Sequence, residues 1–319
     1  MRSLLLLALL MGTGCASTLS SMQTAKPLAR GQFQVSGAMG VFVPASQIVT
    51  LVDEGIQQGK AIKKSIDNDQ RYELSEQDAQ RLLGVGMALA VAPPGTANEL
   101  MVRAGLLESN RLDAGLRLSS TSVRLDTKLR LAHGGDPDDS LLPDYRRHSY
   151  DLAIGVGVAR HIFNSYVLDA LEIVKIDEFS RWDVEVPVYL SMDLGDIFKV
   201  YAAPKYIFSH TSLDAKLVDY SLAGKDVSGF DLTLPASVSS HFYGASMGLA
   251  LGYKYVHVYA EITAGYSYCR PVIFGQQRDL GGVTLYPSIG IAIKNPLPLG
   301  TGGFRPDSPV SPESPVSIP

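Results

Sequence analysis

Apolar and charged residues alternate along the stretch VRLDTKLRL, residues 123–131. Side chains of a β-strand point alternately to its two faces, so this period of two predicts a strand with one aliphatic and one ionic face. Alternation alone does not decide which face contacts water. A soluble sheet buries its aliphatic face, whereas a membrane barrel turns that face to the lipid.

The same alternation recurs in ten segments between residues 31 and 295. Most of these segments have about the length of 9–11 residues that a tilted strand needs to cross a bilayer, and an even number of strands can close into a ring. The sequence therefore predicts an all-β fold, a closed antiparallel transmembrane β-barrel of about ten strands. The predicted strands are residues 32–43, 99–107, 111–119, 123–131, 149–159, 182–192, 197–208, 241–253, 255–268 and 282–294. An alternative of twelve strands would add residues 84–92 and 168–176.

Connection lengths and aromatic residues support the membrane barrel. Short connections alternate with long ones, as expected when turns lie on the periplasmic side and loops on the outside. The short connection 120–123 and the long connection 133–148 do not fit this alternation. Aromatic residues gather near the predicted strand ends, as in the interfacial girdles of membrane proteins. Those near the long loops are Trp182, Tyr206, Phe208, Tyr243, Tyr266 and Tyr268, and those near the short turns are Phe198, Tyr253 and Tyr255.

The ionic face of the predicted strands must then line the lumen. Arginine or lysine on the lipid-facing side would cost about 2–4 kcal/mol each near the bilayer midplane. Charges of both signs on neighbouring strands predict ion pairs that close or narrow the lumen. The predicted inward residues are Arg103, Asp113, Arg117, Arg124, Asp126, Lys128, Arg130, Asp151, Asp183, Glu185, Lys199, Lys205 and Glu261. A soluble sandwich with its leucines inside is the alternative.

Residues 45–97 form the longest connection and carry a helical pattern. Ile48, Val52 and Ile56 lie on one face of a helix at the observed spacing, and Ser75 with Asp78 resembles a capping box. We expect a largely helical insertion after the first strand. It would cap or plug the lumen, or form an ordered surface loop.

Both ends of the chain lie outside the predicted barrel of residues 31–295. Residues 1–15 combine Arg2, an apolar run and small residues, as in a secretory signal peptide that is too short to span a bilayer. Residues 16–30 are small and polar and predict a periplasmic tether. Residues 296–319 are rich in Pro and Ser and predict a disordered tail, which either has no partner or contacts peptidoglycan or a periplasmic protein.

Composition excludes several classes of function. A net charge of -4 argues against a nucleic-acid partner, and the two cysteines, Cys15 and Cys269, build neither a disulfide framework nor a cysteine metal site. The strand threading brings His161, His210 and His241 to the side of the long loops, near several serines. An outer-membrane hydrolase or acyltransferase acting on lipid or peptide at that rim is therefore an alternative function. No catalytic, cofactor-binding or metal-ligating residue is assigned, no cofactor is expected, and enzymatic activity is left open.

Two parts of the sequence carry a resemblance. The stretch MGTGC, residues 11–15, resembles the lipobox of bacterial lipoproteins, which implies lipid attachment at Cys15. Gly12 departs from the aliphatic residue usual at that position of the lipobox, so ordinary cleavage near Ala16 is the alternative. The strand segments within 99–131, 182–210 and 248–268 look like those of uncharacterised outer-membrane β-barrel lipoproteins of Gram-negative bacteria, over about residues 10–294. This resemblance implies an outer-membrane barrel, with outer-membrane lipid as partner, and says almost nothing about activity. From the predicted threading we expect both termini in the periplasm, and from the predicted closed or narrow lumen a structural or small-solute envelope role.

Overall fold

We describe a computed structural model of the chain. The described residues are 18–46, 48–49, 52–53, 56, 60, 94–107, 110–136, 148–162, 174–195, 197–217, 221–222, 225–226, 237–253, 255–273, 276–277 and 279–295. Cys15 and the tail after residue 295 lie outside them. Among the described residues, no helix is long and apolar enough to cross a bilayer.

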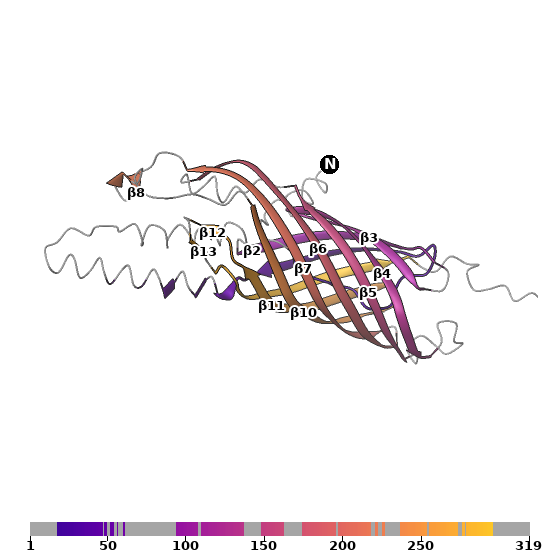
Figure 1. Ribbon diagram of the computed structural model, residues 1–319. Helices are drawn as coiled ribbons and strands as arrows, with labels where there is room; N and C mark the ends of the chain where they lie inside the picture. The colour runs from indigo at the N-terminus through magenta and orange to yellow at the C-terminus, as the bar shows by residue number, and fades with distance from the viewer. Residues whose placement is uncertain are drawn as a thin grey trace, which may run out of the picture.

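Ten antiparallel strands close into a barrel in which each long strand pairs with its neighbours along the chain, and β1 pairs with β14 to close the ring (Figure 1). The barrel strands are β1 (Phe33–Phe42), β2 (Gly95–Gly105), β3 (Leu112–Ser119), β4 (Ser122–Gly135), β5 (His148–His161), β6 (Val174–Leu194), β7 (Phe198–Leu217), β10 (Ser237–Tyr253), β11 (Val256–Cys269) and β14 (Gly282–Lys294). All ten predicted strands are confirmed. The twelve-strand alternative is wrong, because ten strands complete the ring and residues 174–176 are the start of β6.

Among the residues that the structure describes, four further strands of two residues each lie in two of the long connections. Strands β8 (Ser221–Leu222) and β9 (Lys225–Asp226) pair between β7 and β10, and β12 (Val272–Ile273) pairs with β13 (Gln276–Gln277) between β11 and β14. These small sheets lie beyond one end of the barrel in Figure 1.

The two ends of the barrel differ in their connections. At the end that we call the short-turn end, β6 reaches β7 and β10 reaches β11 within three residues, and β1 begins and β14 ends there. The opposite end, which we call the long-loop end, carries the connections from β1 to β2, β5 to β6, β7 to β10 and β11 to β14. The exceptional tight connection from β3 to β4 also lies there. The Ser119 hydroxyl closes it by accepting hydrogen bonds from the backbone N–H groups of Thr121 and Ser122 at 3.3 and 2.9 Å.

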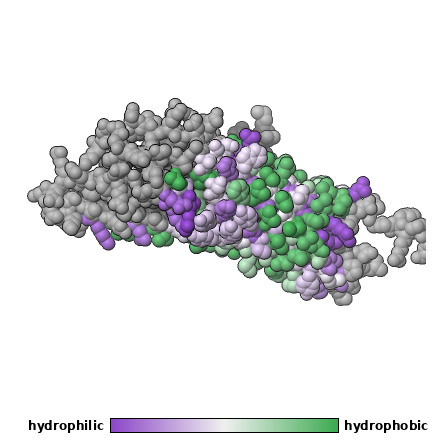
Figure 2. All heavy atoms as spheres, viewed as in Figure 1, coloured by the Kyte–Doolittle hydropathy of each residue, from purple (hydrophilic) through white to green (hydrophobic). Residues whose placement is uncertain are grey.

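The aliphatic face of the strands is the outer surface, as predicted. Leu125 is 65% exposed and Met247 63%, whereas Arg103 on the inward face is 2% exposed. Hydrophobic side chains gather over the strands in Figure 2. A closed ring with an apolar exterior and an ionic interior has the architecture of a transmembrane β-barrel of the outer-membrane type, and not that of a soluble sandwich.

The expected helical insertion is described only in part. Residues 45–46, 48–49, 52–53, 56 and 60 are helical, and the Ile48 N–H donates to the Pro44 carbonyl at 3.0 Å. Residues 95–97 belong to β2, so the insertion ends earlier than expected. Most of the remainder, with Ser75, Asp78 and residues 84–92, lies outside the described residues.

The expectation of a tether at residues 16–30 is wrong for residues 18–29. These residues lie inside the barrel, where Ser20 and Ser21 are each 1% exposed and Ala25 is 0% exposed. Small polar residues suit a solvated linker and a polar lumen equally well, so composition did not separate the two. We call residues 18–29 the luminal segment.

Candidate functional site

The luminal segment runs along the interior from one end of the barrel to the other. At the short-turn end, Arg30 bridges to Gly105, the last residue of β2. The chain passes Gly105 so closely that a side chain there would collide with the Ala29 carbonyl group. At the long-loop end, Thr18 and Leu19 line a cavity together with Ser122 and His161, which lie at the facing ends of β4 and β5. The segment therefore occupies the lumen over its length.

Glu261 on β11 binds backbone N–H groups in the middle of the segment. Its two carboxylate oxygens accept hydrogen bonds from Ser21 N at 2.7 Å and Met22 N at 2.6 Å, and the Tyr201 hydroxyl donates to it at 2.7 Å. Met22 has a positive φ of 41°. Left-handed residues of this kind turn successive N–H groups towards one side, where they form an anion-binding concavity.

Basic side chains bind the carbonyl groups of the segment. The Arg117 guanidinium donates to Ser20 O at 2.6 Å and to Ser21 O at 3.1 Å. The Lys128 ammonium donates to Thr24 O at 2.7 Å, and Lys205 donates to Leu19 O. Hydrogen bonds to charged groups contribute about 1.5–3 kcal/mol each. The lumen thus offers charged donors and acceptors to the backbone of the segment.

Further contacts fix the two halves of the segment. Ala25 N donates to the Ser191 hydroxyl at 3.0 Å, and Leu28 N donates to Asp113 at 3.1 Å. The apolar side chains of the segment pack on inward aromatic and small residues of the wall. Leu19 joins Phe42, Ala97, Ile207, Phe242 and Tyr286, and Met22 joins Tyr201, Ala250, Tyr259 and Ala292, while Ala25 joins Ala153, Tyr189 and Ala203.

The predicted ion pairs of the lumen are present. Arg103 contacts both Asp113 and Asp126, and Asp113 also lies 3.5 Å from the Lys128 ammonium. Other pairs link Arg117 with Glu99 at 3.2 Å, Lys199 with Asp193 at 2.6 Å, and Arg124 with Glu185. Charges buried in this way need partners, because an unpaired charge in a water-poor interior is costly.

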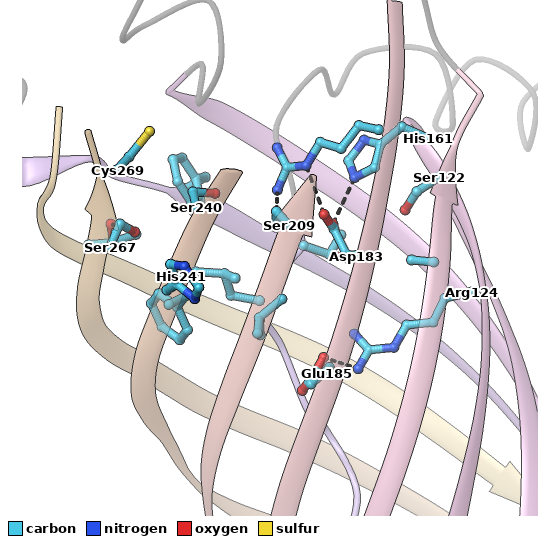
Figure 3. A pocket seen from close by; sticks show the side chains of 18 of the residues that line it. Ser122, Arg124, His161, Asp183, Glu185, Ser209, Ser240, His241, Ser267 and Cys269 are labelled. Atoms are coloured by element: carbon cyan, nitrogen blue, oxygen red, sulfur yellow. Dashed lines mark hydrogen bonds and ion pairs between the residues drawn. The ribbon is translucent and has the colours of Figure 1, made fainter. Parts of the chain in front are cut away.

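A cavity of about 90 Å³ at the long-loop end is lined in part by Leu19. Figure 3 shows His161, Asp183 and other side chains that line it. His161 Nε2 lies 2.9 Å from Asp183 Oδ2, and Arg181 Nε donates to the other carboxylate oxygen at 2.9 Å. Arg181 also reaches the Ser209 hydroxyl at 3.2 Å. This cluster brings an imidazole, a carboxylate and a guanidinium together in one polar cavity.

Of the three histidines predicted at the rim, His161 and His241 both line this cavity, whereas His210 does not. Only His161 is on an inward strand position. His210 is exposed and contacts the Ser239 hydroxyl at 3.1 Å. His241 Nδ1 lies 2.7 Å from the Tyr206 hydroxyl, and its ring is among Tyr206, Phe208, Tyr243 and Tyr268. Among the residues that the structure describes, no hydroxyl or thiol group hydrogen-bonds to His161.

Cys269 is a free, buried thiol that lines the same cavity. Cys15 lies outside the described residues, so its lipidation stays a prediction. Within the described part of the chain, no group of three or more His, Cys, Asp or Glu side chains is placed to hold a metal ion.

No protein-family model and no curated protein matches the sequence. Among solved structures, the chain is similar to Neisserial surface protein A at 11% identity and a TM-score of 0.31, covering 82% of this chain and 95% of that one. It is similar to Ail, the attachment invasion locus protein of Yersinia pestis, at 9% identity and 0.27, with coverages of 83% and 97%. The outer membrane protease OmpT from Escherichia coli gives 9% identity and 0.30, with coverages of 85% and 100%. At these scores no residue role is transferred from them.

Proposed function

We propose that this chain is an outer-membrane lipoprotein of Gram-negative bacteria whose barrel is closed by its own luminal segment and serves as a structural element of the envelope. The apolar outer surface and the ionic interior support the membrane location. The short-turn end would face the periplasm and the long loops the outside. Of the structural and small-solute roles, the filled lumen favours the structural one.

Two partners belong to this proposal. Outer-membrane lipid would surround the aliphatic outer face, and a lipid on Cys15 would add a second anchor. Strand β14 ends at Lys294, at the short-turn end and so on the proposed periplasmic side, and residues 296–319 follow it in the sequence. Their Pro-rich sequence fits an extended contact with peptidoglycan or a periplasmic protein.

The observation that carries the proposal is the occupation of the lumen by residues 18–29. Passage of ions or solutes requires an uninterrupted path of water, and here buried side chains of the wall bind the segment from several strands. We therefore expect the purified protein to insert into planar lipid bilayers without stepwise conductance. A variant that lacks residues 18–29 should conduct, because the removed residues leave a polar passage.

The conductance experiment needs a check of folding. Both proteins should migrate faster on a gel before heating than after it, since folded barrels resist unfolding in detergent. As a matched control, deletion of twelve residues from the tail, 305–316, should leave the bilayer silent. Steady conductance of the intact protein would contradict a closed lumen.

The pair formed by His161 and Asp183 supports a second candidate, a hydrolase or acyltransferase acting at the long-loop end. A carboxylate that orients an imidazole is part of the apparatus that activates a nucleophile, and Ser122 and Ser209 line the same cavity. If the cluster is catalytic, His161→Ala alters the lipid composition of the membrane or abolishes peptide cleavage, while His210→Ala, on the outside of the barrel, does not. Identical lipid and peptide profiles in both variants would count against an enzyme.

A further inference from the structure

The path of the luminal segment determines where the chain leaves the barrel on its N-terminal side. Arg30 lies at the short-turn end, next to the last residue of β2. Thr18, twelve residues before Arg30 in the sequence, lines the cavity at the long-loop end with Ser122, His161 and Thr284. The segment thus crosses the barrel once, from the side on which β1 begins to the opposite side.

Chain length restricts the position of the residues before Thr18. Cys15 precedes Thr18 by three residues, and three extended residues span at most about 11 Å. Returning to the short-turn end would require a second passage through a lumen that residues 18–29 and the packed wall already fill. Cys15 therefore has to stay near the long-loop end while the segment keeps its contacts.

The lumen is also the wrong environment for an acyl chain. Its wall presents buried Arg117, Lys128, Lys205 and Glu261 to the segment. Burial of aliphatic chain among charged groups would remove hydration from those groups without replacing it. By contrast, the outer surface at the long-loop end carries exposed aromatic and aliphatic side chains, including Trp182, Tyr243 and Tyr268 at 45%, 56% and 40% exposure. Aromatic residues of this kind lie at the membrane interface.

We propose that the mature N-terminus emerges at the long-loop end, so that an acyl group on Cys15 inserts into the leaflet on that side, the outer leaflet. This inference rests on the proposed function for the presence of the lipid, but the path of the chain holds for an unmodified N-terminus as well. It replaces the expectation of a periplasmic N-terminus. The barrel would then be anchored on both sides: by lipid at the cell surface and by its tail in the periplasm.

The N-terminus can emerge at the long-loop end only if the luminal segment stays inside the barrel. Withdrawal towards the short-turn end would break the bonds from Ser21 and Met22 to Glu261 and those from Arg117 and Lys128 to backbone carbonyls. It would also remove the apolar packing of Met22 against Tyr201 and Tyr259 and of Ala25 against Tyr189. The wall is thus complementary to the segment in charge and in shape.

Protease accessibility in intact cells tests the inference. A recognition site for a sequence-specific protease, flanked by glycine and serine residues, is inserted between Ser17 and Thr18. A matched site between Arg30 and Gly31, both exposed at the short-turn end, serves as control, and a third site after Gln277 marks the long loops. We expect added protease to cut the first and third sites in intact cells, and the second only after the outer membrane is permeabilised.

A further variant reverses the expected result. Deletion of residues 18–29 places Ser17 directly before Arg30, so the first site, kept in this variant, should be cut only after permeabilisation. Protection of the first site in intact cells with the full-length segment would overturn the inference. So would resistance of that site after permeabilisation, because it would mean that residues 15–17 are enclosed. Migration before and after heating verifies that each variant is folded.

Mass spectrometry of the released N-terminal peptide separates this inference from the proposed lipidation. Cleavage in intact cells with an acylated Cys15 supports both. Cleavage with an unmodified N-terminus supports the path of the chain and contradicts the lipid. An acylated peptide that is released only after permeabilisation supports the lipid and contradicts the path. As an independent readout, Thr18→Cys in a Cys269→Ala background should react with a membrane-impermeant maleimide on intact cells, to a greater extent than the Cys269→Ala parent.

Discussion

Arg103 links two acidic residues in the interior of the barrel. It is 2% exposed and contacts Asp113 and Asp126, which are 0% and 7% exposed. Asp113 in turn accepts a hydrogen bond from Leu28 of the luminal segment. One arginine therefore connects the wall of the barrel with the segment inside it.

Replacing Arg103 by Met should destabilise the folded protein by about 3–5 kcal/mol, because two carboxylates would lose a buried partner. The measurement is urea unfolding in lipid vesicles, followed by tryptophan fluorescence. Arg160→Met is the control. Arg160 lies outside the barrel over the Trp182 ring at 5.1 Å, and a contact of this kind contributes about 0.5–1 kcal/mol at an exposed site. Equal losses in the two variants would refute the role of the buried pair.

Outside the strands, Arg270 and Asp279 form a contact that depends on pH. Asp279 accepts a hydrogen bond from Gly281 N at 2.9 Å and another from Arg270 at 3.0 Å, and these bonds lower the pKa of its carboxyl group. A lowered pKa means that the contact is complete above the ordinary pKa of aspartate, about 3.9. It is lost only as the pH falls through the lower value of the folded protein.

In Arg270→Gln the pKa of Asp279 should rise towards its ordinary value, since the positive partner is gone. The pH titration of the Gly281 amide resonance by NMR reports it, and its midpoint should move to higher pH. Asp279→Asn should abolish the transition. An unchanged midpoint in Arg270→Gln would show that the Gly281 bond alone sets the pKa.

At the scale of the strand, the alternation of apolar and polar residues was sufficient to predict every barrel strand. Each residue of a strand that crosses the bilayer faces either the lipid or the lumen. The same pattern predicted poorly where strands leave the bilayer. Strand β6 begins at Val174 rather than 182, and β7 continues to Leu217 rather than 208. Beyond the hydrocarbon both faces of a strand contact polar surroundings, so no period of two is required there.

Of the candidate site, the sequence predicted the wall of the barrel but not the luminal segment inside it. Arg117, Lys128 and Glu261 were expected inside because their strands alternate, but nothing in residues 18–29 marks a segment that binds them. Thr, Ser and Gln satisfy hydrogen bonds equally well in water and in a polar lumen. Their placement depends on hydrogen bonds between residues up to 244 positions apart in the chain, and no local pattern encodes such contacts.

Residues on the lipid-facing surface of β10 are predicted to lie at different depths in the bilayer. Met247 lies on the outward face of β10 between Tyr243 and Tyr253, so it is near the bilayer midplane. Met247→Arg should destabilise the barrel in vesicles by about 2–4 kcal/mol, and Tyr253→Arg, at the interface, by only about 0–1 kcal/mol from its charge. Urea unfolding of the two variants in vesicles measures the difference. A larger loss at Tyr253 would contradict the assigned depth.

At the scale of the whole molecule, the luminal segment acts as a core for a fold that otherwise has a polar interior. Its residues join three clusters of buried apolar side chains, around Leu19, Met22 and Ala25. Deletion of residues 18–29 should therefore lower the temperature at which the folded band disappears from a detergent gel, beyond any effect of the tail deletion. An unchanged temperature would mean that the wall is stable without the segment.

The seam between β1 and β14 has a consequence for biogenesis. The luminal segment leads directly into β1, and this strand completes the ring only by pairing with β14, the last strand of the barrel to be synthesised. A finished ring whose interior is packed would not admit the segment afterwards. The sheet must therefore enclose the luminal segment before β1 pairs with β14. Glu261, Arg117 and Lys128 would bind the segment while the sheet is still open.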